Sequence, residues 1–241
     1  MYDPGHTGEE HINPVYGSSN YLTEKELRNM WAHYAGEVTL VDKWFGLFME
    51  KIYELGLDKN TLIIFTSDHG HQFGENELVG KVAYGLYPEL VDIPLFIRLP
   101  EGTYGGKRIN IYVQHHDLFA IILRSVNINI DFKVDGRDIL RVLEDDKIDE
   151  EYCNRKYVML GFGNYIAYID DDYWMITDRD FKDIKLFDRK RDSELKNNIA
   201  DESKDIVSEI HKKVLHEAGG YLPKLKMHTE LSSKWYSVYN L

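Results

Sequence analysis

The sequence has little of several residue classes, and each scarcity excludes something. Cys153 is the only cysteine among 241 residues, so a disulfide within the chain is impossible. This fits a reducing compartment, and we expect a cytoplasmic protein. No apolar run approaches the roughly 20 residues that a bilayer-spanning helix needs, so no membrane association is expected. The first residues, Met-Tyr-Asp-Pro-Gly, have neither the basic nor the apolar region of a signal peptide.

Positive charge is also scarce, with 29 Lys and Arg against 41 Asp and Glu and a formal net charge of -12. Such a chain repels phosphate backbones, so nucleic-acid binding would need a local basic patch. The basic clusters at 107–108 and 188–192 are short and mixed with turn residues or acids. We therefore expect no nucleic-acid partner. A small anionic substrate is not excluded, because a metal ion and one lysine can set the field of a pocket.

What remains is ordinary globular composition, with 43% hydrophobic and 29% charged residues. Apolar residues at helical spacing predict a long helix that begins with a capping box at Thr23 and Glu26 and ends at Gly56. The continuous apolar run 61–66 is typical of a central strand in a parallel sheet, and 93–98 predicts a second such strand. Helix, short turn and buried strand make half of a βαβ unit, so an α/β architecture is favoured.

The pattern changes near residue 150. Short segments rich in aromatic and β-branched residues, separated by Gly-Asn or Asp clusters, predict an antiparallel meander. They are 157–162, 165–170, 173–177 and 184–188. An amphipathic helix over 201–218 follows them. We predict two domains, an α/β parallel-sheet domain over 1–150 and a small α+β domain over 151–241, with an antiparallel sheet and a C-terminal helix.

The residues most able to do chemistry follow the first predicted strand. Asp68 and His69 lie just past its carboxyl end, the edge at which open α/β sheets bind ligands. Both can face one divalent cation if the chain turns sharply, which Gly70 permits. Lys81 could then hold an anionic group at the metal. The residues alone equally allow a plain turn, because a metal site usually has three or more ligands.

A second pair of histidines has a plainer interpretation. His115 and His116 lie between a predicted short strand, 111–113, and a predicted helix, 117–126. Asp117 is placed to cap that helix. The pair is therefore more typical of a turn than of two metal ligands. Two interpretations of His71 stay open. It is either a plain loop residue or a residue that contacts and supports the metal ligands without binding the metal.

Several segments follow one another in a fixed order. They are 60–70, Gly74-Glu75, Gly80-Lys81, Tyr87-Pro88-Glu89, 93–98, Gln114 with Asp117-Leu118, 136–140, 186–188 and 198–201. This order closely resembles the sulfatase family of the alkaline phosphatase superfamily. Its signature runs from a strand through Ser-Asp-His/Asn-Gly, Gly-Glu and Gly-Lys to a strand that begins at Val/Ile-Pro. The resemblance implies the sulfatase-like α/β fold.

The resemblance also implies roles for single residues. Asp68 and His69 match two ligands of the family's divalent metal, and Lys81 matches the lysine that binds sulfate or phosphate oxygens. His69 stands where the family more often has asparagine. A histidine at this position is similar to the phosphonate and phosphate ester hydrolases of the superfamily. Calcium is the family's usual ion, and manganese or zinc stays open. The implied reaction is hydrolysis of a small sulfate, phosphate or phosphonate ester.

The family pattern marks what is absent as well. Relatives have two further acidic metal ligands and a nucleophile in Cys/Ser-x-Pro-x-Arg, which is oxidised to formylglycine, and neither occurs in this sequence. Cys153 precedes Asn-Arg and lies after the metal motif, so we interpret it as structural or incidental. We therefore expect the C-terminal part of a sulfatase-type protein, inactive by itself.

Two alternatives to a simple fragment stay open. The chain is either a remnant that serves as a binding module or one half of a split hydrolase. A parallel sheet without its neighbouring strands exposes edges and an apolar face. We accordingly expect self-association into a homo-oligomer through the exposed sheet edges.

Overall fold

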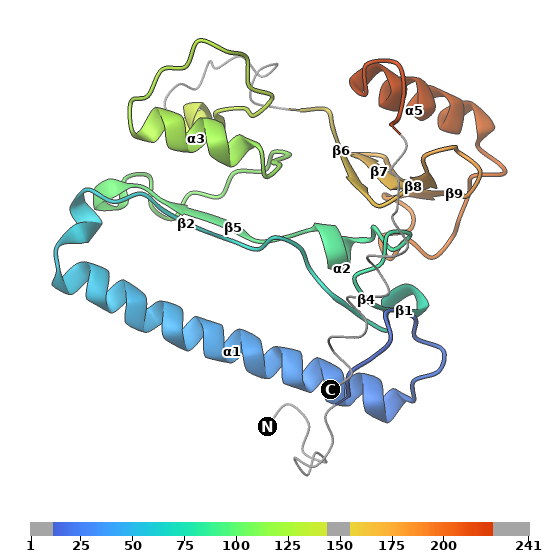
Figure 1. Cartoon of the computed structure of the whole chain (residues 1–241), viewed down its shortest axis with the longest axis horizontal. Helices are drawn as coiled ribbons and strands as arrows, with labels where there is room; N and C mark the ends of the chain where they lie inside the picture. Colours follow the sequence, from blue (N-terminus) through green and yellow to red (C-terminus); the bar gives the residue numbers. More distant parts are fainter. Residues whose placement is uncertain (1–11, 144–154, 224–241) are drawn as a thin grey trace. The chain divides into compact units, whose positions relative to one another are not determined.

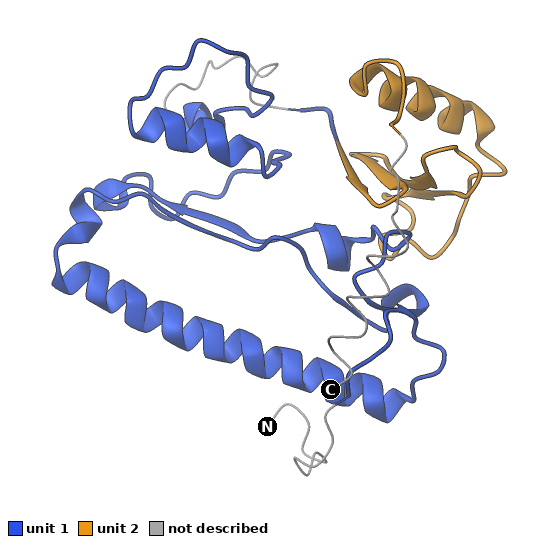
Figure 2. Cartoon of the chain, in the orientation of Figure 1, with its two compact units in different colours: residues 1–158 blue, residues 159–241 orange. Residues whose placement is uncertain are grey.

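The computed structural model describes residues 12–143 and 155–223 of the chain. The chain divides into two compact units, residues 1–158 and 159–241 (Figure 2). Cys153 and the acidic residues around it lie outside the described residues, so the interpretation of that cysteine stays a prediction. Within the described ranges, no helix combines the length and apolar character that a membrane span requires.

The first long element is helix α1, Glu24–Glu54, and the capping box predicted at its start is confirmed. The Thr23 hydroxyl accepts a hydrogen bond from the amide of Glu26 at 3.3 Å, while the Glu26 carboxylate accepts from the amide of Thr23 at 2.7 Å. Two of the amides that a helix start leaves unpaired are thereby satisfied. Gly56 ends the helical region in a left-handed conformation, with φ of 66°.

The two predicted apolar strands are present but run in opposite directions. Strand β2, Ile63–Thr66, pairs antiparallel with β5, Leu95–Arg98, so Thr66 lies opposite Leu95. The expectation of a parallel arrangement for this pair is therefore wrong. A parallel pair needs a crossover, usually a full helix. The connection here contains only helix α2, Pro88–Val91, besides short strands and a 3₁₀ turn, so the chain folds back beside itself.

The connection between these strands has a small sheet of its own. Strand β1, Gly17–Ser18, pairs with β4, Leu78–Gly80, and β4 pairs with β3, Gln72–Phe73. Val79 of β4 is fully buried in this sheet. The pairing places Lys81 directly after β4, at the end of a rigid strand.

Helices cover both faces of the β2–β5 pair (Figure 1). On the α1 side, the rings of Phe45 and Phe65 have centroids 4.8 Å apart. Side chains alternate along a strand, so Ile64 faces the other way, toward helix α3, Asp117–Ser125. There it packs against a buried cluster that is centred on Ile121. The helix predicted over 117–126 is thus confirmed, and it covers one face of the sheet.

The short strand predicted at 111–113 does not form. The backbone groups around it bond to side chains instead of a partner strand. The carbonyl of Tyr112 accepts from Arg155 at 3.3 Å, and the amide of Gln114 donates to Asp117 at 2.8 Å. Because these groups are already used, this stretch stays irregular.

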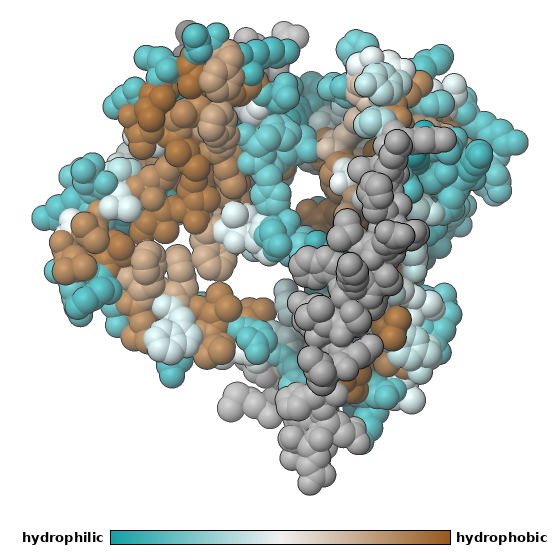
Figure 3. Space-filling model, viewed as in Figure 1, coloured by the Kyte–Doolittle hydropathy of each residue, from teal (hydrophilic) through white to brown (hydrophobic). Residues whose placement is uncertain are grey.

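Apolar side chains gather on the surface over α1, some of them visible in Figure 3. Trp44 is 62% exposed, and Phe96 of the adjoining strand is 66% exposed. The further large apolar residues of α1 that are about half exposed are Trp31, Tyr34, Val38, Leu40, Val41, Leu47 and Phe48. Monomeric proteins rarely leave so much contiguous apolar surface in water, so this face of α1 is suited to an intermolecular or interdomain contact.

The second unit confirms the predicted meander and its final helix. Its elements are β6 (Tyr157–Phe162, which starts in the first unit), β7 (Tyr165–Asp170), β8 (Tyr173–Asp178), β9 (Ile184–Asp188) and α5 (Lys204–Glu217). The strands follow one another in space in the order of the sequence. Trp174 and Met175 of β8 are buried, as are Ile210 and Val214 of α5.

Candidate functional site

The candidate site begins at Asp68, two residues after β2 ends at Thr66. The carboxylate Oδ2 of Asp68 lies 3.3 Å from Nε2 of His69. The other carboxylate oxygen, Oδ1, accepts a hydrogen bond from the backbone amide of His69 at 2.9 Å. This bond fixes the carboxylate beside the ring, while the Asp68 side chain remains 84% exposed to solvent.

The hydrogen bond of Nδ1 determines which tautomer the neutral His69 ring adopts. Nδ1 lies 2.7 Å from the carbonyl oxygen of Gly70. A carbonyl can only accept, so Nδ1 carries the proton and Nε2 of the neutral ring has a free lone pair. A backbone carbonyl that holds Nδ1–H in this way is the usual partner of a histidine that binds metal through Nε2.

The loop that carries both residues is held close to the chain before β5. The amide of Gly70 donates to the carbonyl of Leu90 at 2.8 Å. A Cβ atom at residue 70 would lie 2.0 Å from the carbonyl oxygen of Glu89. Gly70 was expected to permit a sharp turn, and the structure gives a different reason for it: a side chain has no room here.

The acidity of the Asp68 carboxyl group reflects the groups around it, Lys81 among them. The pKa of Asp68 is lowered from 3.8, chiefly by the hydrogen bond from the His69 amide. Burial opposes this shift, and the charge of Lys81 lowers the pKa further, as does that of His69 when its ring is protonated. Asp68 and His69 thus lie together in the loop after β2, and the charge of Lys81, the residue after β4, acts on the Asp68 carboxylate.

His71 lies next to this group among aromatic rings. Its ring centroid is 4.6 Å from that of Phe73 and 5.6 Å from that of Tyr16. Burial lowers the pKa of His71 below 6.5, the charge of His69 lowers it further when that ring is protonated, and Glu75 acts in the opposite direction. This position is next to the candidate ligands, and whether His71 supports them stays a prediction.

The prediction that Asp117 caps α3 is wrong. His116, not Asp117, is the N-cap of α3, and no side-chain capping bond forms there. The buried Asp117 carboxylate instead forms a bidentate pair with Arg155 and accepts from the amides of Arg137 at 2.7 Å and Gln114 at 2.8 Å. A carboxylate already held by four donors is not available as a cap.

The turn predicted at His115 and His116 is confirmed, but one contact of His115 was missed. Its Nε2 lies 2.8 Å from the carbonyl oxygen of Ser67, beside the candidate ligands. The two residues are 48 positions apart, and no local pattern predicts such a contact. Only the packing of α3 against the β2–β5 pair reveals it.

The donors present fit part of a metal site. Neighbouring ligands with bonds of about 2.0–2.2 Å lie roughly 3 Å apart, close to the separation of Asp68 Oδ2 and His69 Nε2. A carboxylate oxygen can bind calcium, manganese or zinc, whereas an imidazole nitrogen is a typical ligand of transition ions. Among residues 12–143 and 155–223, no group of three or more His, Cys, Asp or Glu side chains is gathered for a metal. The loop therefore offers two positions of a coordination shell.

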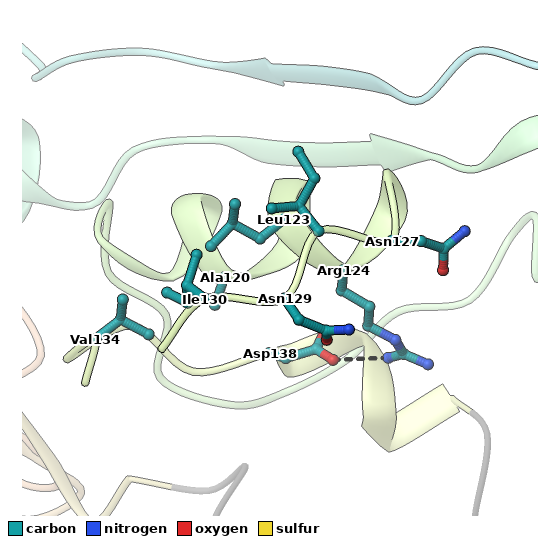
Figure 4. A pocket seen from close by; sticks show the side chains of 9 residues that line it. Ala120, Leu123, Arg124, Asn127, Asn129, Ile130, Val134 and Asp138 are labelled. Atoms are coloured by element: carbon teal, nitrogen blue, oxygen red, sulfur yellow. Dashed lines mark hydrogen bonds and ion pairs between the residues drawn. The ribbon is translucent and has the colours of Figure 1, made fainter. Parts of the chain in front are cut away.

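Two pockets of the first unit are lined by other residues. One cavity of about 830 Å³ lies between β5, the 103–113 segment and the 3₁₀ turn Ile139–Leu143. The other, of about 360 Å³, lies beside α3, where Arg124 pairs with Asp138 at 2.8 Å (Figure 4). Asp68, His69 and Lys81 line neither of them.

The family model for sulfatases matches residues 4–128, slightly more than half of the chain. The chain belongs to the sulfatase family. A multifunctional alkaline phosphatase superfamily protein, PehA of Trinickia caryophylli, is 35% identical over 132 residues, which are 54% of this chain and 25% of that protein. A sulfatase of Escherichia coli, YidJ, is 28% identical over 173 residues, 70% of this chain and 33% of that protein.

Solved structures extend the likeness to the fold. Phosphonate monoester hydrolase of Agrobacterium radiobacter superposes with a TM-score of 0.74 at 21% identity, over 86% of this chain and 44% of that one. A sulfatase from Bacteroides fragilis superposes with a TM-score of 0.66 at 25% identity, over 83% and 44%. The predicted sulfatase-like α/β class is thus confirmed, although its β2–β5 pair is antiparallel.

The chain is much shorter than the relatives that it matches. The chain spans between a quarter and about two fifths of the curated relatives named first among its matches. Members of the family hydrolyse sulfate and phosphonate esters, as the names of these relatives indicate.

Proposed function

We propose that this chain supplies part of a metal-dependent site for hydrolysis of sulfate, phosphate or phosphonate esters. The observation that carries the proposal is the pair of donor atoms in the loop after β2, Asp68 Oδ2 and His69 Nε2, which lie 3.3 Å apart. The proton of His69 is held on Nδ1 by the Gly70 carbonyl, so Nε2 is ready to bind a cation.

In this proposal each residue has a separate task. Asp68 and His69 hold the divalent ion, which would polarise an ester oxygen and offset the charge that develops on the transferred group. Lys81, on the end of β4, attracts the sulfuryl or phosphoryl oxygens of a small ester substrate. His71 supports the loop from its position beside Phe73. The ion is calcium by family preference, and a manganese or zinc ion also fits one oxygen and one nitrogen donor.

We further propose that these 241 residues are inactive alone, because the family's nucleophile motif and two acidic ligands do not occur in them. The test is turnover of p-nitrophenyl sulfate and bis(p-nitrophenyl) phosphate by the purified chain with calcium or manganese. We expect none. Metal-dependent turnover that Asp68→Ala abolishes would contradict the proposed inactivity.

Metal binding is tested separately from turnover. Mn²⁺ broadens the NMR signals of nearby protons, so titration of the chain should broaden the His69 imidazole before other histidines. Asp68→Ala should weaken this effect at least about tenfold, since it removes one of the two donors. Asp201→Asn changes an exposed carboxylate in the second unit and should change nothing. Broadening that survives Asp68→Ala would overturn the proposed ligand.

One observation favours a second candidate function, that of an interaction module. The apolar face of α1 is about half exposed, and Trp44 is 62% exposed. Such a face fits a second polypeptide, either another copy or a partner that completes the hydrolase. Light scattering after size-exclusion chromatography tests self-association. A monomeric mass at every concentration would exclude the homo-oligomer. The apolar face of α1 would then fit only a different polypeptide.

A further inference from the structure

His115 reaches the candidate site from a distant part of the chain. Its Nε2 lies 2.8 Å from the carbonyl oxygen of Ser67. The carbonyl can only accept, so Nε2 carries the proton and donates it. Because Nε2 is used in this bond, the His115 ring holds the backbone of the loop at Ser67.

Ser67 is in turn hydrogen-bonded to one of the candidate ligands. Its hydroxyl donates to the carbonyl oxygen of His69 at 2.8 Å. At the other end of the loop, the amide of Gly70 donates to the carbonyl of Leu90. Asp68 and His69 therefore lie between two hydrogen bonds to other segments, one from the turn before α3 and one to the chain before β5.

The backbone that carries His115 is itself held in place by hydrogen bonds. The amide of Leu118 donates to the His115 carbonyl at 3.1 Å, which closes the turn that leads into α3. The neighbouring Asp117 is fully buried and bonds the amide of Gln114 at 2.8 Å. Since Arg155 holds the same carboxylate, the backbone of His115 cannot shift without disturbing a buried ion pair.

We infer that His115 is a positioning residue, which fixes the loop of Asp68 and His69 through its Nε2–H bond to Ser67. The part of this inference that concerns metal affinity rests on the proposed function. The part that concerns the order of the loop does not. Residues behind metal ligands typically alter affinity by tenfold or more when they hold a ligand directly. His115 acts one step further back, through the backbone, so a smaller effect is expected.

Three variants separate the hydrogen bond from the bulk of the ring. His115→Leu keeps a side chain of similar size without a donor. His115→Gln restores an N–H at nearly the reach of Nε2. His216→Leu is the matched control, because His216 is exposed in the last turn of α5.

The first measurement is hydrogen exchange of the whole chain, followed by mass spectrometry and NMR. His115→Leu should speed amide exchange about three- to tenfold at residues 67–70, the range expected from loss of one net hydrogen bond. Exchange in α1 should stay unchanged, which shows that the variant is folded. His115→Gln should return the rates to within about twofold of wild type. Unchanged rates at 67–70 in His115→Leu, or failure of His115→Gln to restore them, would overturn the inference.

The second measurement is the Mn²⁺ titration of the His69 signals. His115→Leu should weaken binding about three- to tenfold, and His115→Gln and His216→Leu should bind as wild type does. If wild type binds Mn²⁺ and His115→Leu binds equally well, positioning of the ligands is disproved. If wild type binds no Mn²⁺, the proposed function fails, and the exchange rates alone still decide whether His115 orders the loop.

Discussion

Arg155 and Asp117 form a buried bidentate ion pair that joins the start of α3 to the residue two positions before β6. The Arg155 side chain is 7% exposed and that of Asp117 is 0% exposed. Each carboxylate oxygen also accepts one backbone amide, from Arg137 or from Gln114. One carboxylate thus ties three separate segments of the first unit together.

Removal of the guanidinium should be costly. Arg155→Met leaves a fully buried carboxylate without its counter-ion, and we expect a loss of roughly 3–5 kcal/mol in the free energy of unfolding. Urea unfolding measures the loss. The control is Lys190→Met, which breaks the exposed ion pair with Asp172 and should cost far less, because solvent screens exposed charges. Equal losses in the two variants would show that burial of the first pair has no energetic consequence.

The same carboxylate should make stability depend on pH. Burial alone would raise the pKa of Asp117, but hydrogen bonds from Arg155 and from the amides of Arg137 and Gln114 outweigh it and hold this pKa below 3.8. The folded pKa is lower than the unfolded one, so the contribution is complete above about pH 4 and is lost as pH falls through the folded value.

Comparison with Asp117→Asn isolates this contribution. The difference in unfolding free energy between wild type and variant should be constant from about pH 7 to pH 5 and should shrink as pH falls below about 4. Urea titrations at several pH values measure it. A difference that is independent of pH down to pH 3 contradicts the lowered pKa.

Gly70 should not tolerate a side chain. Gly70→Ala places Cβ 2.0 Å from the Glu89 carbonyl oxygen, so backbone must move, at a cost of about 1–3 kcal/mol. Broadening of His69 by Mn²⁺ should weaken in the same variant. The matched control is Gly36→Ala in the middle of α1, where no atom lies within 4 Å of the added Cβ. There we expect a gain of about 0.5–1 kcal/mol.

Asn198 should matter in the second unit. Its side-chain oxygen accepts from the amides of Leu186 at 2.9 Å and Ala200 at 3.1 Å, and its amide donates to the Ile184 carbonyl at 3.2 Å. Asn198→Ala should destabilise the unit by about 1 kcal/mol, the net contribution of a typical hydrogen bond. Asn197→Ala, at the preceding exposed residue, should stay within about 0.5 kcal/mol. Exchange rates in β9 report the difference, and similar rates in the two variants would contradict it.

Local patterns predicted the parts of the fold that local chemistry determines. The capping box at Thr23 and the alternating strands of the second unit could be read because each depends on neighbours within a few residues. The direction of β5 relative to β2 could not, since an apolar run looks the same in either direction. The absence of a crossover helix between them was the available signal.

The candidate site divides in the same way. Asp68 and His69 are adjacent in sequence, so their pairing was accessible before the structure. The contacts of His115 with Ser67 and of Arg155 with Asp117 span 48 and 38 residues. Such contacts depend on how α3 packs on the sheet, which no local pattern contains. Whether Asp68, His69 and Lys81 act as proposed stays a prediction.

The bond between the Gly70 amide and the Leu90 carbonyl has a consequence for how this site can vary. It closes residues 71–89 into a loop whose two ends are pinned together, with Lys81 on its far part. Strands β3 and β4 inside this loop are paired and Val79 is fully buried, so the strands themselves cannot change length freely. The turns between them can, at about 0.6 kcal/mol for each doubling of a flexible stretch. The residue at position 81 and the turns beside it can therefore vary to suit a different anionic group, while the carboxylate and imidazole keep their places.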